Sequence, residues 1–219
     1  MIKVEGGVPF FKFNQLENSG VINFVSTRIG GVSQDSRDAL NLSFDNESVG
    51  QGLFLHESEI DGVDGMITTL PNICLCVVSA DCLPIVFFES EKRIISILHS
   101  GWRGLSSGII EKMVSSITEI GGNPKKIKVC IGPFIDAKNY EVEDVYHLFS
   151  DIPKALFPKS QSKKYLDLGV VATSKLTEMK IVRENIEMSG YSTYSDAHLF
   201  FSYRRNKPTG AIMTGVMLK

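Results

Sequence analysis

Cys82 and His99 lie on either side of a polar turn, SEKR at 90–93, that joins two apolar, strand-like runs. If the two runs pair directly across this turn, Pro84 falls opposite His99. Cys82 is two residues before Pro84, so its side chain faces the same side of the sheet. Thiolate and imidazole are the ligand types that ions such as zinc prefer. The spacing therefore predicts a thiol and an imidazole placed to share one metal ion.

Polar residues lie next to this pair in the sequence, at the end of the hairpin, where core packing does not explain them. SADCLP places Asp81 beside Cys82, where its carboxylate could orient a ligand. HSGWRGL follows the second strand with two glycines, which allow backbone to approach a ligand closely. Arg103 precedes a helix expected from about residue 105, and guanidinium and helix N-terminus could together hold an oxyanion such as phosphate. A surface salt bridge is the alternative role of Arg103.

The same residues allow two other classes of function. In a metal-free cysteine hydrolase, Cys82 would be the nucleophile, His99 its base and Asp81 the group that orients the base. In a non-catalytic binding module, the metal site would be incomplete. Thiol alkylation separates the first alternative from a zinc enzyme, because a zinc-bound thiolate is protected until the metal is removed.

The composition excludes several partners. The 23 basic and 25 acidic side chains leave a formal charge of −2, which predicts neither nucleic-acid nor anionic-membrane binding. No apolar run approaches the roughly 18 residues of a membrane span, and the first residues lack the apolar core of a signal peptide. We therefore expect a cytoplasmic protein without disulfides, in which Cys74, Cys76 and Cys130 are small core residues. The sequence does not indicate the oligomeric state.

Strand and helix patterns mix without strict alternation, and no phosphate-binding glycine loop follows a strand. These features predict an α+β fold, a mixed β-sheet with flanking helices, in a single domain of residues 1–219. The expected helices are residues 105–122, 144–149 and 168–179. The expected strands are residues 21–27, 66–69, 73–80, 84–89, 93–100, 126–132, 198–205 and 211–218.

Several stretches along nearly the whole chain resemble one known family. They are VSTRIGGVS (25–33), LNLSF (40–44), SADCLPIVFF (79–88), LHSGWRGL (98–105), IGPFI (131–135), YEV (140–142), YLDL (165–168) and FFSYRR with TG (200–210). In these stretches the chain is similar to the YfiH-type proteins. That family was long labelled polyphenol oxidase or laccase-domain protein, and is more recently regarded as purine nucleoside phosphorylase with adenosine deaminase activity. The resemblance implies a YfiH/CNF-like single domain.

The resemblance also implies a zinc site made by two histidines and one cysteine. It places the cysteine at Cys82 and one histidine at His99, and the remaining candidate is His56 in LFLHESE. A solvated loop residue is the alternative reading of His56, because the segment around it is shorter than in the family. The implied reaction is phosphorolysis of adenosine, inosine or methylthioadenosine, with purine nucleoside and phosphate as partners.

Further residues follow from the matched motifs. Arg28 and Asn41 are expected to line the pocket, and Tyr140 to stack on or hydrogen-bond a base. Of the remaining histidines, His147 is expected to pack on a helix face and His198 to lie near the substrate. With four histidines in all, the chain cannot build a multicopper centre. Copper could still replace zinc at the single site and give phenol oxidation there.

Overall fold

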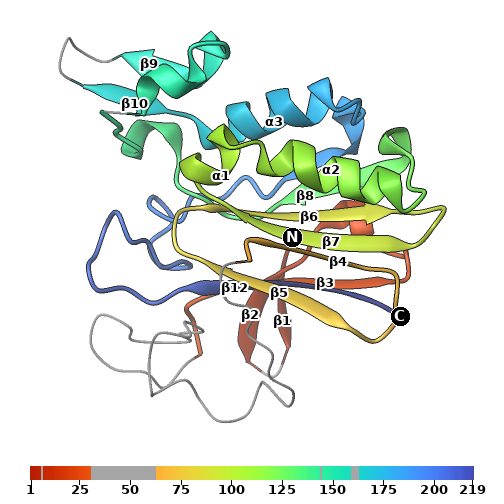
Figure 1. Cartoon of the computed structure of the whole chain (residues 1–219). Helices are drawn as coiled ribbons and strands as arrows, with labels where there is room; N and C mark the ends of the chain where they lie inside the picture. The colour runs from red at the N-terminus through yellow and green to blue at the C-terminus, as the bar shows by residue number, and fades with distance from the viewer. Residues whose placement is uncertain (6, 31–62, 144, 159–162) are drawn as a thin grey trace.

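The computed structural model describes residues 1–5, 7–30, 63–143, 145–158 and 163–219. Within these residues the chain forms two five-stranded sheets and a layer of helices (Figure 1). The N-terminal sheet is antiparallel throughout. Its strands are, in spatial order, β1 (Ile2–Glu5), β2 (Val8–Phe11), β3 (Val21–Ser26), β12 (Ile212–Leu218) and β5 (Cys74–Ser79).

The second sheet, called here the central sheet, is mixed, because β11 is parallel to β8 and the other pairs are antiparallel. Its strands are, in spatial order, β11 (Ile186–Met188), β8 (Ile127–Ile131), β6 (Leu83–Glu89), β7 (Ile94–Ser100) and β4 (Gly65–Thr68). Helices α1 (Trp102–Ser106), α2 (Ile109–Glu119) and α3 (Leu168–Glu178) lie over it, and β9 (Leu156–Pro158) pairs with β10 (Lys164–Leu166) in a separate ribbon. The predicted α+β class with a mixed sheet and flanking helices is confirmed.

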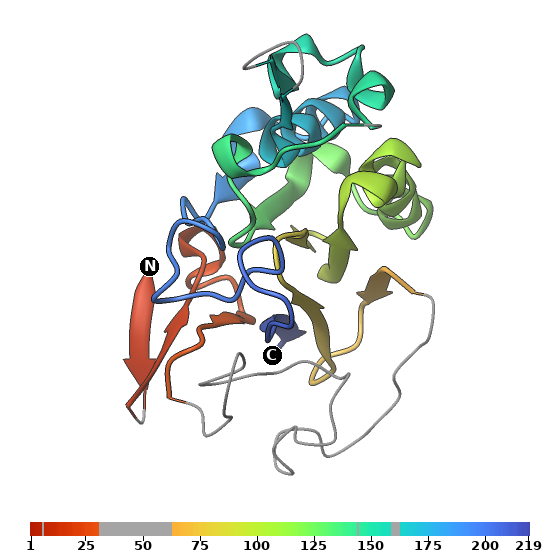
Figure 2. The same cartoon turned by 90° about the vertical axis from the view of Figure 1, so that its left-hand side faces the viewer.

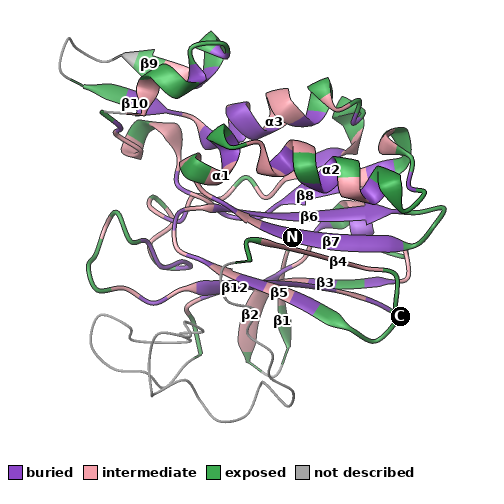
Figure 3. Cartoon of the chain, in the orientation of Figure 1, coloured by how far each residue is buried: buried purple, intermediate pink, exposed green. Residues whose placement is uncertain are grey.

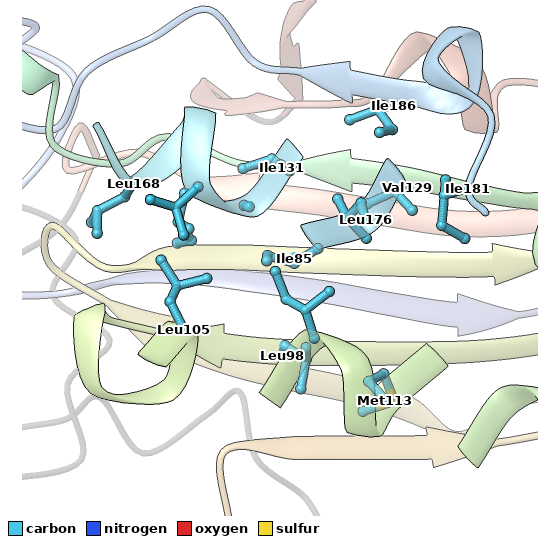
Figure 4. Packing of buried hydrophobic residues seen from close by; sticks show 14 of the residues in the cluster. Ile85, Leu98, Leu105, Met113, Val129, Ile131, Leu168, Leu176, Ile181 and Ile186 are labelled. Carbon is cyan, nitrogen blue, oxygen red and sulfur yellow. The ribbon is translucent and has the colours of Figure 1, made fainter. Parts of the chain in front are cut away.

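The central sheet is buried on both faces, as its continuous apolar runs require. Every residue of β6 is buried (Figure 3). On one face, side chains such as Ile85 and Leu98 pack against α2 and α3 (Figure 4). On the other face, Val86 and Ile97 pack against the N-terminal sheet. The hairpin of β6 and β7 is therefore the middle layer of the molecule.

The helix expected at residues 105–122 is divided in two. Gly108 adopts a left-handed backbone with φ of 78°, which ends the first helical turn and begins α2. The helix expected at 168–179 forms as α3, and the Asp167 carboxylate caps its first turn by accepting a hydrogen bond of 3.0 Å from the Val170 amide. Within residues 144–149, a short 3-10 turn at Tyr146–Phe149 replaces the expected α-helix.

The strand expected at residues 198–205 is wrong. Leu199, Phe200 and Phe201 are buried, but they lie in turns and irregular backbone. The Leu199 and Phe200 amides donate to the Asp196 carbonyl and the Leu199 carbonyl accepts from the Arg28 amide, so the backbone bonds there without a neighbouring strand. The Arg205 guanidinium donates hydrogen bonds to the carbonyls of Thr193, Tyr194 and Phe200. In Figure 2 this segment, in blue, loops between the N-terminal strands and the start of β6.

The core assignment of the cysteines holds for Cys130, which is fully buried. It is wrong for Cys74, which is exposed, and only partly right for Cys76, which is half-buried. The reason is strand alternation, since β5 turns Leu75 and Val77 toward the core and its two cysteines outward.

Candidate active site

The register of the hairpin brings Cys82 and His99 to one face. Glu89 pairs with Ile94 across the turn and Pro84 lies opposite His99, which confirms the predicted register. Cys82 immediately precedes β6 and lies against Gly101, where an added Cβ would be 2.9 Å from the Cys82 Sγ. Thiol and imidazole are thus diagonal neighbours at the end of the hairpin, on the side that faces the N-terminal sheet.

A carboxylate that the sequence analysis did not name holds the imidazole. His99 Nδ1 lies 2.9 Å from Asp64 Oδ1. The His99 backbone amide also donates a hydrogen bond of 2.8 Å to the Asp64 carbonyl. An ionised carboxylate can only accept, so Nδ1 carries the proton and Nε2 is the nitrogen left for another ligand. Asp64 directly precedes β4. Only a correct prediction that β4 pairs with β7 would have placed Asp64 beside His99.

The surroundings of Cys82 keep its thiol protonated in the absence of a cation. Burial, which is the largest cause, and the negative charges of Asp81 and Asp64 together raise the pKa of Cys82 to about 11. The charge of Arg103 acts in the opposite direction. A neutral thiol is a poor nucleophile, whereas a bound metal ion would stabilise the thiolate. This environment suits a metal ligand better than a free nucleophile.

Asp81 does not contact His99 and is engaged elsewhere. Its Oδ1 accepts a hydrogen bond of 2.7 Å from the Thr193 hydroxyl, and its Oδ2 accepts one of 2.6 Å from the Arg204 amide. Asp81 has a positive φ of 101° and is 7% exposed. The expectation that Asp81 orients the histidine is therefore corrected. It fastens the start of β6 to the 193–204 segment instead.

Arg103 lies within helix α1 rather than before a helix at residue 105. Its side chain is exposed, and its guanidinium carbon lies 4.4 Å from the centre of the Trp102 ring. Its positive charge lowers the pKa of Cys82 and of Tyr140, so it acts on the side of the molecule that carries both. Since α1 has only five residues, the helix N-terminus expected to assist Arg103 adds little.

Tyr140 belongs to the same neighbourhood. Burial and, to a smaller extent, the nearby Cys82 raise its pKa to about 12, against the opposing charge of Arg204. The Arg204 guanidinium carbon lies 5.1 Å from the centre of the Tyr140 ring, and Nη1 donates a hydrogen bond of 2.8 Å to the Glu141 carbonyl. The sequence analysis quoted Arg204 only within the FFSYRR motif and gave it no role.

The other predicted residues lie on other segments of the chain or outside the described residues. Arg28 follows β3, donates a hydrogen bond of 3.1 Å to the Ala197 carbonyl and lies 4.9 Å from the Phe201 ring centre. His147 and His198 are exposed. Asn41 and His56 are outside the described residues. Across the residues that the structure does describe, no three histidine, cysteine or acidic side chains gather into a metal-binding group. Two of the three predicted ligands are thus placed near each other.

The fold and this cluster define an α+β protein in which a half-buried cysteine and a carboxylate-supported histidine meet at the end of a hairpin. The chain belongs to the family described as multi-copper polyphenol oxidoreductase laccase, whose model matches residues 46–219. This agrees with the expected YfiH-type family.

Curated relatives carry a different functional name. The chain is 30% identical over 234 residues to "Purine nucleoside phosphorylase YfiH" of Escherichia coli, covering 91% of this chain and 94% of that protein. It is 30% identical over 167 residues to "Purine nucleoside phosphorylase" of Bacteroides thetaiotaomicron, covering 73% of this chain. The chain spans only 62% of the length of that relative.

Solved structures share the fold over the full chain. The crystal structure of Bacillus licheniformis hypothetical protein YfiH superposes with a TM-score of 0.85 at 24% identity, covering 100% of this chain and 99% of that one. No helix in the described ranges is long and apolar enough to cross a membrane.

Proposed function

We propose that this chain is a zinc-dependent purine nucleoside phosphorylase that also deaminates adenosine. The observation that carries the proposal is the orientation of His99 by Asp64, on the hairpin face that also carries Cys82. The names of relatives at 25–37% identity support the phosphorylase part. Adenosine, inosine and methylthioadenosine are the proposed nucleosides, with inorganic phosphate as the second substrate.

The donor set fits a zinc ion. A thiol and an imidazole are zinc ligands, and a carboxylate on the far nitrogen of the ring is the usual support for such a histidine. Cys82 and His99 would hold the ion together with His56, the proposed third ligand. When bound, zinc supplies a positive charge that stabilises the thiolate and can polarise a water molecule or a substrate oxygen.

The neighbouring side chains suit the two substrates. In phosphorolysis a phosphate oxygen bonds to C1′ of the ribose as the C1′–N9 bond breaks, and the purine takes up a proton. Arg103 supplies positive charge on the side of Cys82 and is the proposed partner of the phosphate. Tyr140 keeps its hydroxyl proton near neutral pH because its pKa is about 12, so it can donate a hydrogen bond to the nucleoside. Asn41 and Arg28 remain proposed pocket residues.

Assays of zinc-loaded protein test the proposal. We expect adenosine and inosine to yield free base and ribose 1-phosphate only when phosphate is present, and adenosine to yield inosine as well. Cys82→Ala and His99→Ala should lower turnover by more than about 100-fold and reduce the zinc content. His147→Ala, which changes an exposed histidine, is the matched control and should change neither. Absence of phosphate-dependent cleavage in the zinc-loaded chain would refute the phosphorylase proposal.

Copper-dependent phenol oxidation remains a second candidate because the family description names it. Among divalent ions, copper binds nitrogen and sulfur sites more tightly than zinc. We expect copper-loaded protein to oxidise phenols slowly and to lose nucleoside turnover. The metal-free cysteine hydrolase is disfavoured by the raised pKa of Cys82. Rapid alkylation of Cys82 in zinc-loaded protein would restore it as the leading alternative.

A further inference from the structure

Two thiols lie side by side on the outer face of the N-terminal sheet. The Sγ atoms of Cys74 and Cys76 are 3.5 Å apart. Both point away from the core, because the alternate residues Leu75 and Val77 point into it. Strand β5 is the edge strand of this sheet, and Cys74 is exposed. The pair is therefore accessible to solvent without unfolding.

A methionine lies across from the pair on the neighbouring strand. Met217 on β12 lies directly opposite Cys74, so its side chain shares the outer face. Gly215 lies opposite Cys76, and a Cβ there would be 3.2 Å from the Cys76 Sγ and 2.4 Å from a carbon of the Phe24 ring. The glycine thus allows the aromatic ring to lie beside the thiols. The thiols of Cys74 and Cys76, the thioether of Met217 and the ring of Phe24 thus form one surface, called here the sulfur patch.

This sulfur patch is separate from the candidate active site. Cys74 begins β5, whereas Cys82 lies beyond its other end. The six residues from Cys74 to Ser79 are joined by five steps of extended strand, which span about 16 Å. The sulfur patch is also on the outer face of the N-terminal sheet, and Cys82 is on the side of the central hairpin that faces that sheet.

We propose that Cys74 and Cys76, assisted by Met217, form a binding site for a thiophilic monovalent cation of the copper(I) class. Soft thiolate and thioether donors select such ions over hard cations, and two thiolates suffice for a two-coordinate ion. Binding exchanges the two thiol protons for the ion and needs no oxidant or reductant.

Competition for copper(I) tests the site. The full chain in a Cys82→Ser background, reduced with a phosphine under nitrogen, is titrated against copper(I) bicinchoninate, and withdrawal of copper is read from the colour of the chelate. We expect one equivalent to be withdrawn at chelator concentrations that hold free copper(I) very low. Cys74→Ser and Cys76→Ser should each abolish that equivalent. Met217→Leu should keep the stoichiometry and weaken the affinity.

Met213→Leu is the matched control, since Met213 is on the same strand and face but opposite Val78, away from the thiols. It should behave like the Cys82→Ser background. Unchanged withdrawal of copper by both serine variants, with their folds verified by circular dichroism, would overturn the proposal. The titration measures metal alone, and Cys74→Ser should leave nucleoside turnover unchanged, so this result is independent of the proposed enzymatic function.

Discussion

His99 Nδ1 lies 2.9 Å from Asp64 Oδ1, and the backbone of His99 is bonded to the backbone of the same residue. The imidazole ring is therefore fixed through Nδ1 by Asp64, the residue that precedes the edge strand β4. In the proposed zinc site this contact would leave Nε2 for the ion, and Asp64 would position the ring rather than bind the metal.

Asp64→Ala should weaken zinc binding by about 10- to 100-fold, because the ring loses its orientation and its tautomer is no longer fixed. Zinc affinity measured with a competing chelator checks this. Glu91→Ala is the control, because the Glu91 side chain is 57% exposed, like the 60% exposed side chain of Asp64, and pairs with Lys126 at the surface. Equal zinc affinity in wild type and Asp64→Ala would show that the contact is incidental.

Gly101→Ala should disturb the thiol without straining the backbone. Gly101 has an extended φ of −88°, which any residue adopts, but its added Cβ would be 2.9 Å from the Cys82 Sγ. We expect lower zinc affinity and lower turnover with little change in unfolding free energy. Gly104→Ala is the neighbouring control, since its Cβ would meet the Ser100 hydroxyl at 3.2 Å and not the thiol. An unaltered zinc affinity in Gly101→Ala would contradict the position assigned to Cys82.

Asp81→Ala should destabilise the fold by about 1–3 kcal/mol, because two hydrogen-bond donors lose their carboxylate acceptor. These are the Thr193 hydroxyl and the Arg204 amide. Thr193→Val removes one of the two bonds and should cost about 1 kcal/mol. Urea unfolding measures both. If Asp81→Ala removed activity with unchanged stability, Asp81 would have a direct role in the reaction.

The carboxylate of Asp136 should make stability depend on acid pH. Burial raises its pKa, but hydrogen bonds from Ser192, Ser195 and Asn139 outweigh burial and hold the pKa below the usual value of 3.8. A folded-state pKa below the unfolded value contributes stability at neutral pH that is lost as the pH falls below about 4 through the folded value.

Ser192→Ala should raise the folded-state pKa of Asp136 and so flatten this acid dependence. The unfolding midpoint of wild type and variant, measured from pH 7 to pH 3, should differ most at pH 7 and converge toward pH 3. Ser150→Ala, which removes an exposed hydroxyl, should give a curve parallel to wild type. A difference in unfolding midpoint that stays constant at all pH values would show that the Ser192 hydroxyl stabilises the fold independently of the charge on Asp136.

The sequence by itself determined the hairpin and therefore the Cys82 and His99 pair. Two continuous apolar runs around a four-residue polar turn allow one register, and strand alternation then assigns each side chain to a face. The helix at 168–179 was predictable for a similar reason, because its Asp cap and its apolar spacing are local signals. The composition, with four histidines, also excluded a multicopper centre.

Only the tertiary structure decided which groups surround that pair. Asp64 reaches His99 through the pairing of β4 with β7, and Asp81 finds Thr193 112 residues away. A single carboxylate or hydroxyl has no periodicity that reveals its partner. The apolar residues at 198–205 could equally have been a strand, and only the contacts of the folded chain, among them the bonds made by Arg205, hold them in turns instead. Contacts between distant segments depend on which surfaces pack together, and that choice is made by the whole core rather than by any local pattern.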